Sequence, residues 1–202
     1  MESKIAKTPL LVVSLAFCWI TNLSGCSIAQ LQHDDLQEPA QRRSGNVNLE
    51  PKATGFTGGR VGWGRVTLFS IPVVPIHIHS DEASDLMVVV RDALAIAGYA
   101  AHFVDNAQPG PVLKAHVDEV RFNNYTWVVP LVPTWGRLHV TLRLESADGP
   151  VLWEKSFEGS GHTYNFTDGY NIAATRIVTK LANSMVEAFG SQEFSNALSE
   201  GG

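Results

Sequence analysis

Apolar and polar residues alternate along much of the chain, and their period predicts the secondary structure. Over residues 113–122, and again over residues 137–145, apolar residues recur at every second position, as in strands with one face on a core and one face in water. The first of these strands changes phase near Asp118 or Glu119, which predicts a β-bulge there. Other strands are expected over residues 65–71, 76–79, 101–104 and 151–157, the last followed by a glycine-rich loop at 159–161.

Two stretches instead have the 3.6-residue period of amphipathic helices. The apolar stripe of the first consists of Leu86, Val89, Val90, Ala93, Leu94 and Ala97, and Gly98 is expected to end it. The apolar stripe of the second consists of Ala174, Ile177, Val178, Leu181, Met185, Ala188 and Phe189, with Gly190 as its end. A short tail, 192–198, has room for one last turn. The resulting order, β-α-β-β-β-β-α, predicts an α+β fold: a two-layer sandwich with a mostly antiparallel sheet and two helices on one face.

The chain begins with a basic segment containing Lys4 and Lys7, followed by an uncharged apolar run over residues 9–20. That run is about 12 residues long, too short for a bilayer span of roughly 20 but typical of an export signal. Leu23-Ser24-Gly25-Cys26 follows it and resembles the lipobox of bacterial lipoproteins. The resemblance implies that Cys26 receives a lipid and becomes the first residue after cleavage. Because Ser27 rather than Asp follows, it also implies an outer-membrane protein. The alternative is a core helix of a cytosolic domain, with Cys26 in this context by chance.

This interpretation divides the chain into a signal peptide (1–25), a lipidated N-terminus with a flexible tether (26–57) and a single periplasmic domain (58–202). Residues 27–57 are polar and aperiodic, which favours a tether. Isolated apolar residues, among them Leu31, Val47 and Leu49, leave an alternative open, an irregular arm packed on the domain. The glycine-rich segment 58–64 is expected to be a flexible entry into the domain.

The charge and the cysteines narrow the range of functions. The formal net charge is −5, whereas a nucleic-acid-binding surface would be basic, so nucleic acid is not an expected partner. The two cysteines are Cys18, inside the apolar run, and Cys26. The domain therefore contains neither a disulfide nor a reactive thiol.

The segment after the predicted bulged hairpin reads Asp148-Gly149-x-Val151-Leu152-Trp153-Glu154-x-x-Phe157-x-Gly159. It is similar to a recurring strand motif of small envelope lipoproteins built like the amino-terminal domain of TolB, including the curli secretion lipoprotein and YajG-like lipoproteins. The element order over residues 65–190 resembles theirs as well. The resemblance implies the two-layer fold and a protein complex of the cell envelope as the partner.

Two apolar segments with paired prolines, 70–77 and 127–135, stand out from this pattern. Proline is excluded from central strands, so both are expected at sheet edges or in loops. As the tip of a hairpin, the second would present a partner-binding surface of Tyr125, Trp127, Val129, Leu131 and Trp135. Such an exposed apolar patch marks a protein or membrane contact. The alternative is that the two segments cover each other.

Histidines provide the candidate metal ligands. His77 and His79 have the spacing of two ligands on one side of a strand, suited to zinc or copper. The other candidates are His102, His116, His139 and His162, of which His116 and His139 could be cross-strand neighbours. The alternative is that these histidines are solvated, and no cofactor is expected.

The sequence contains no GxSxG elbow, no P-loop and no GxGxxG after a strand. The leading hypothesis is therefore a non-enzymatic adaptor of the bacterial envelope, anchored by lipid on Cys26 and facing the periplasm. A metal-binding lipoprotein that uses His77 and His79, or an unrecognised envelope hydrolase, are the alternatives.

Overall fold

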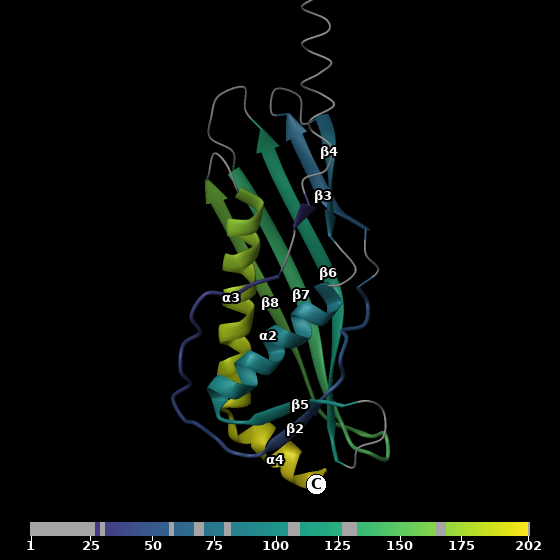
Figure 1. Cartoon of the computed structure of the whole chain (residues 1–202), viewed down its shortest axis with the longest axis vertical. Coiled ribbons are helices and arrows are strands. Elements are labelled where there is room, and N and C mark those ends of the chain that lie inside the picture. The colour runs from purple at the N-terminus through teal and green to yellow at the C-terminus, as the bar shows by residue number, and fades with distance from the viewer. Residues whose placement is uncertain are drawn as a thin grey trace, which may run out of the picture.

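The computed structural model describes residues 27–28, 31–56, 59–66, 71–78, 82–104, 110–126, 133–164 and 169–201 (Figure 1). The strands in these ranges are β1 (Ser27–Ile28), β2 (Asn46–Leu49), β3 (Gly59–Val66), β4 (Ile71–Ile78), β5 (Ala100–Phe103), β6 (Val112–Thr126), β7 (Pro133–Glu145) and β8 (Val151–Tyr164). The helices are α2 (Glu82–Ala97), α3 (Gly169–Phe189) and α4 (Gln192–Glu200). The predicted α+β class is confirmed, but four strands rather than one precede α2 in the described ranges, and α4 follows α3.

The eight described strands form one sheet with β6 near its centre. The long ladders β6–β7 and β7–β8 are antiparallel, and Val117 lies opposite Val140 as the alternation predicts. The register shifts between Val117 and Glu119, which confirms the bulge. Two shorter strands share the other edge of β6, β3 at its C-terminal end and β2 at its start. Among the described strands, β8 pairs only with β7, so it is an edge strand.

Helices α2 and α3 cover one face of this sheet. Figure 1 shows α3 running along β7 and β8 while α2 crosses it. Every residue of the two predicted apolar stripes is buried, which confirms both helices. Gly98 has a φ of +103°, the left-handed conformation that ends a helix, and it follows α2 directly.

The C-terminal tail forms a complete helix, α4, rather than one last turn. Ser191 caps it by accepting a hydrogen bond from the backbone N–H of Phe194. The ring of Phe194 is buried and meets the indole of Trp153 edge-on, at 5.0 Å between centroids. The helix therefore closes the end of the core formed by β8 and α3.

Residues 31–56 are not a flexible tether, and that prediction is wrong. The side chains of Leu31, Val47 and Leu49 are at most 5% exposed, within the main core. Strand β2 pairs in parallel with both β5 and β6. The structure therefore favours the alternative of a packed arm, and the domain includes these residues. The signal segment and Cys26 lie outside the described residues.

The glycine-rich and proline-containing segments both form strands. Residues 59–66 belong to β3, so the expectation of a flexible entry is wrong there. Strand β4 contains Pro72 and Pro75 and pairs with β3 through an irregular register. Its other neighbour, β1, has only two residues. The first proline segment thus lies at the margin of the sheet, where the missing N–H donors cost least.

The expectation of a glycine-rich loop at 159–161 is also wrong, because these residues continue β8 beneath α3. A Cβ on Gly159 would collide with the backbone carbonyl oxygen of Ile177, and one on Gly136 would lie 2.8 Å from the Ile177 side chain. Gly136 pairs with Gly161 across β7 and β8. Together Gly136, Gly159 and Gly161 form a glycine floor that lets α3 approach the strands closely.

Truncating a core residue of the arm distinguishes a packed arm from a tether. Leu49→Ala removes a fully buried side chain from β2, so we expect the free energy of unfolding to fall by about 2–5 kcal/mol. Urea unfolding of the full-length protein measures the loss. Ala40→Ser, at an exposed position of the same arm, should leave the midpoint unchanged. Equal midpoints for the two variants would show that the arm adds no stability.

The glycine floor predicts a graded response to added methyl groups. Gly159→Ala places its methyl group against the backbone of α3, so we expect the free energy of unfolding, measured by thermal denaturation, to fall by about 1–3 kcal/mol. The nearest contact of a methyl group at Gly161 is the Ile177 side chain, at 3.2 Å, and the backbone of α3 is 3.9 Å away, so Gly161→Ala should cost less. A reversed order of the two losses would contradict close packing of α3 on this floor.

Candidate functional site

Strands β6 and β7 form the predicted hairpin. The candidate partner-binding residues lie where β6 ends and β7 begins. Tyr125 lies on β6 and Trp135 on β7, where it pairs with Asn123. The side chain of Tyr125 and the whole of Trp127, Val129 and Leu131 lie outside what the structure describes. Trp135 is therefore the predicted contact residue whose surroundings can be analysed.

Trp135 lies on the sheet face opposite the helices, which we call the outer face. Its side chain is 37% exposed, whereas Gly136 beside it is buried against the helix layer. His162 is its direct neighbour on β8. Tyr164, 65% exposed, meets the His162 ring edge-on at 5.9 Å. One end of an otherwise polar face thus presents an aromatic group.

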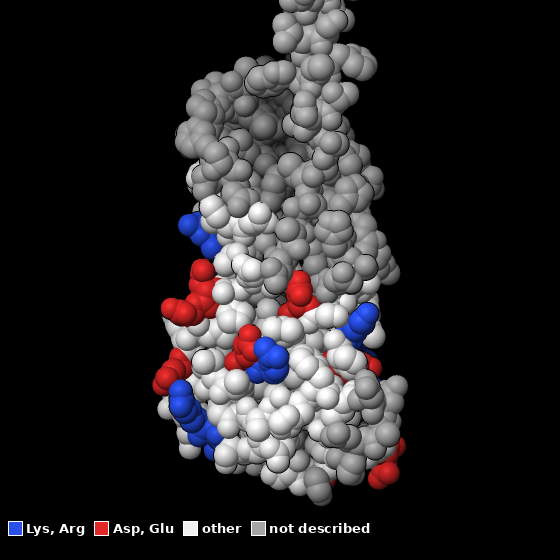
Figure 2. Space-filling model, in the orientation of Figure 1, with Lys and Arg blue, Asp and Glu red and all other residues white. Residues whose placement is uncertain are grey.

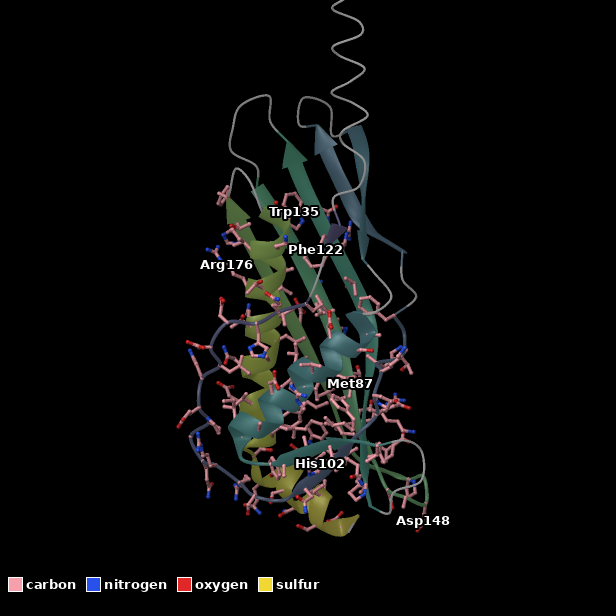
Figure 3. All side chains as sticks on the ribbon, viewed as in Figure 1. Met87, His102, Phe122, Trp135, Asp148 and Arg176 are labelled. Carbon is pink, nitrogen blue, oxygen red and sulfur yellow. The ribbon has the colours of Figure 1, made fainter. Side chains whose placement is uncertain are left out.

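A groove of about 1030 Å³ extends from this aromatic group across β6, β7 and β8 to α3; we call it the outer-face groove. Glu119, Arg121 and Asn123 line it from β6, and Trp135 and Arg137 from β7. Ser160 and His162 of β8 follow, and Arg176 and Lys180 of α3 close its far side. Figure 3 shows Trp135 and Arg176 toward the same end of the molecule, opposite the turn that holds Asp148.

Basic side chains dominate the middle of the groove. Arg121 and Arg137 lie directly opposite each other on β6 and β7, and Ser160 continues their row on β8. Arg137 also forms an ion pair with Glu158 at 3.1 Å, in which both side chains are about half exposed. Exposed pairs of this kind contribute little stability, so Arg137 can exchange this partner for another anion.

Helix α3 adds two cations from beyond the edge of β8. Arg176 and Lys180 are four residues apart and therefore lie on one face of the helix. The Arg176 guanidinium donates to the backbone oxygen of His162 at 3.2 Å, and the Lys180 amine donates to the Ser160 hydroxyl at 3.5 Å. Both side chains thus reach around the free edge of the strand.

The rest of the outer face is charged but internally paired. Arg143 contacts Glu154 at 2.6 Å, and Lys114 contacts Glu145 at 2.8 Å. The hydrogen bond from Lys114 to Glu145 raises the pKa of the lysine. On the described part of the opposite face, shown in Figure 2, acidic and basic side chains are scattered without an area of one sign. The groove is therefore the place where described positive charge gathers.

The candidate metal ligands do not come together among the described residues. His116 pairs with Thr141 and His139 with Glu119, so the suggestion that these histidines are cross-strand neighbours is wrong. His77 lies on β4 without a described side chain, and His79 is outside the described ranges. Within those ranges no group of three His, Cys, Asp or Glu side chains could hold a metal ion.

The bulge in β6 carries an acid and histidine pair on this face, Asp118 and His139. Asp118 accepts a hydrogen bond from the Thr141 hydroxyl at 2.7 Å and lies 3.7 Å from Nδ1 of His139. The neighbouring Ser156 hydroxyl bonds with Thr141 rather than with the imidazole. This network ties three strands together and does not align a serine with a histidine for nucleophilic attack.

Sequence reasoning missed the basic residues of the groove. Arg121 and Arg137 occupied expected polar positions of strands, and only their register makes them neighbours. The spacing of Arg176 and Lys180 was a usable signal, because positions i and i+4 share a helix face. Their proximity to β8 depends on the glycine floor, two of whose residues, Gly159 and Gly161, were expected in a loop.

No family model matches the chain, and no curated protein matches it. None of the helices in the described ranges has the length and apolar character that a bilayer crossing requires. Solved structures do match. Protein XCC0632 from Xanthomonas campestris, assigned to family DUF330, is 16% identical with a TM-score of 0.50, over 85% of this chain and 97% of that one.

Two further structures are more distant. The PelC dodecamer from Paraburkholderia phytofirmans is 16% identical with a TM-score of 0.39, over 77% of this chain and 94% of that one. A minor lipoprotein from Acinetobacter baumannii is 15% identical with a TM-score of 0.39, over 76% and 92%. The resemblance to TolB-like domains remains a prediction. The comparisons establish that this chain shares the fold of the Xanthomonas protein.

Proposed function

We propose that the protein is a non-enzymatic, lipid-anchored adaptor of the bacterial cell envelope, attached to the outer membrane and facing the periplasm. The observation that carries the proposal is the exposed pair Trp135 and Tyr164 at the hairpin end of the outer face. Leu23-Ser24-Gly25-Cys26 supports the lipid anchor and the envelope location.

The chemistry of this surface suits a protein partner. Tryptophan, tyrosine and arginine are enriched in the residues that supply most of the binding energy of protein interfaces. Trp135, Tyr164 and Arg137 combine all three types on one face that no described helix covers. The polar residues around them form the kind of rim that surrounds such a centre.

The anchor would hold the domain close to the membrane. Strand β1 begins at Ser27, immediately after the proposed lipidation site, and pairs with His77 and Ile78 of β4. The arm that follows is packed on the domain, so it provides no long reach. An adaptor mounted in this way meets partners that lie at the same membrane surface.

The anchor predicts a simple processing defect. Cys26→Ser removes the thiol that accepts the lipid, so we expect an uncleaved and unlipidated precursor. Intact-mass spectrometry of the protein from membrane and soluble fractions measures both modifications. Lipidation or normal cleavage of the variant would contradict the proposed anchor.

The adaptor role predicts that position 135 touches a partner in cells. A photo-reactive phenylalanine analogue in place of Trp135 should form a discrete adduct with one envelope protein. The same analogue at Val151, 50% exposed at the opposite end of the sheet, is the matched control and should form none. Loss of a central tryptophan costs about 2 kcal/mol or more, so Trp135→Ser should reduce co-purification of that protein at least about tenfold.

Two results would count against this role. The first is that positions 135 and 151 give the same pattern of adducts, or none. The second is that Trp135→Ser leaves co-purification unchanged while thermal unfolding shows a stable protein.

A further inference from the structure

From the layout of the outer-face groove we infer the chemistry of the partner: the groove takes an extended acidic segment of a protein, whose carboxylates bind Arg121, Arg137, Arg176 and Lys180. This inference rests on the proposed adaptor function. It names a second contact next to the aromatic pair Trp135 and Tyr164.

The local charge of the groove favours an acidic ligand. Four cations and one carboxylate, Glu119, line the groove, and a second carboxylate, Glu158, pairs with Arg137, which leaves an excess of positive charge although the whole chain has a net charge of −5. Arg121 and Arg137 face each other directly, and like charges in such positions destabilise a sheet. Among the described residues, Arg121 has neither an ion pair nor a hydrogen bond that would offset this repulsion. An anion between the two guanidinium groups would relieve it.

The spacing of the cations favours an extended ligand. Neighbouring strands lie about 4.8 Å apart, so the backbone of Arg121 on β6 is about 10 Å from that of Ser160 on β8, which Lys180 contacts. A ligand that bridges this width suits the four cations better than a single carboxylate or phosphate ion does. In an extended peptide, side chains on one face recur about every 7 Å, which lets successive carboxylates reach successive cations.

Side chains, rather than the edge of β8, are placed to hold such a peptide. The edge of β8 could in principle accept a further strand. However, Arg176 already donates to the outward oxygen of His162, so that position is occupied. Recognition therefore falls to side chains, and arginine binds carboxylates through two parallel hydrogen bonds. Trp135 supplies an apolar contact at the end of the groove for the residues that flank the acidic run.

Fluorescence polarisation of the full-length protein in detergent tests this with a fluorescein-labelled deca-glutamate peptide. We expect saturable binding that weakens with salt, because exposed ion pairs are screened. Single exposed pairs contribute at most about 1 kcal/mol, so Arg121→Gln should raise the Kd about threefold and Arg121→Gln with Lys180→Gln about tenfold. The matched control is Arg143→Gln, on the same face but paired with Glu154 and outside the groove. It should leave the Kd unchanged.

Several outcomes would overturn the inference. Absence of saturable binding, or an Arg143→Gln effect as large as that of the double variant, would remove the groove as the site. Displacement of the peptide by equimolar inorganic phosphate would indicate a single-anion site. Tighter binding of polygalacturonate than of the peptide would identify a glycan site instead.

This experiment is separable from the test of the adaptor role. Peptide binding that follows the predicted order supports the groove even if the crosslinker at position 135 captures no protein. In that case the adaptor function fails and the charge recognition stands. If position 135 forms a discrete adduct but the peptide does not bind, the adaptor function stands and the recognition of an acidic segment by the groove fails.

Discussion

The close packing of α3 on the glycine floor of β7 and β8 is the contact on which the rest of the structure depends. Gly136, Gly159 and Gly161 leave room for the Ile177 side chain and for the helix backbone. The same packing places the apolar stripe of α3 against the sheet. At the C-terminal end of α3, the rings of Trp153, Phe189 and Phe194 close the core. Side chains larger than hydrogen at the floor would push the helix outward, and the gap would cost packing along its length.

This contact also shapes the opposite side of the sheet. With the helix this close, Arg176 and Lys180 reach past β8 to the backbone of His162 and to Ser160. They thereby join Arg121 and Arg137, which the register of β6 and β7 places side by side. The core packing on one face thus assembles a basic groove on the other. The proposed binding of an acidic segment depends on this arrangement, which lies beside the exposed Trp135.

The sequence predicted the parts of the fold that long periodic patterns encode. Both helices and the β6–β7 hairpin with its bulge were found because each spans many residues with one period. Strand β2 was missed because two apolar residues, Val47 and Leu49, are too few to establish a period. Residues 159–161 were misread because glycine signals a turn more often than a close approach of a helix. The groove could not be predicted, since its lining comes from four elements whose register only the folded sheet defines. Trp135 is 37% exposed, but it lies on β7, between β6 and β8, rather than in a loop or an edge strand as the proline-containing segment predicted.

If the close packing of α3 forms both the core and the groove, a change at the glycine floor should alter ligand binding. The affinity of the Gly159→Ala variant for the acidic peptide is therefore the most direct test. The Kd is measured under conditions in which circular dichroism shows the variant folded, with Leu49→Ala as a core defect remote from the groove. The account predicts weaker peptide binding for Gly159→Ala and unchanged binding for Leu49→Ala. Unchanged binding by a destabilised Gly159→Ala protein would contradict it.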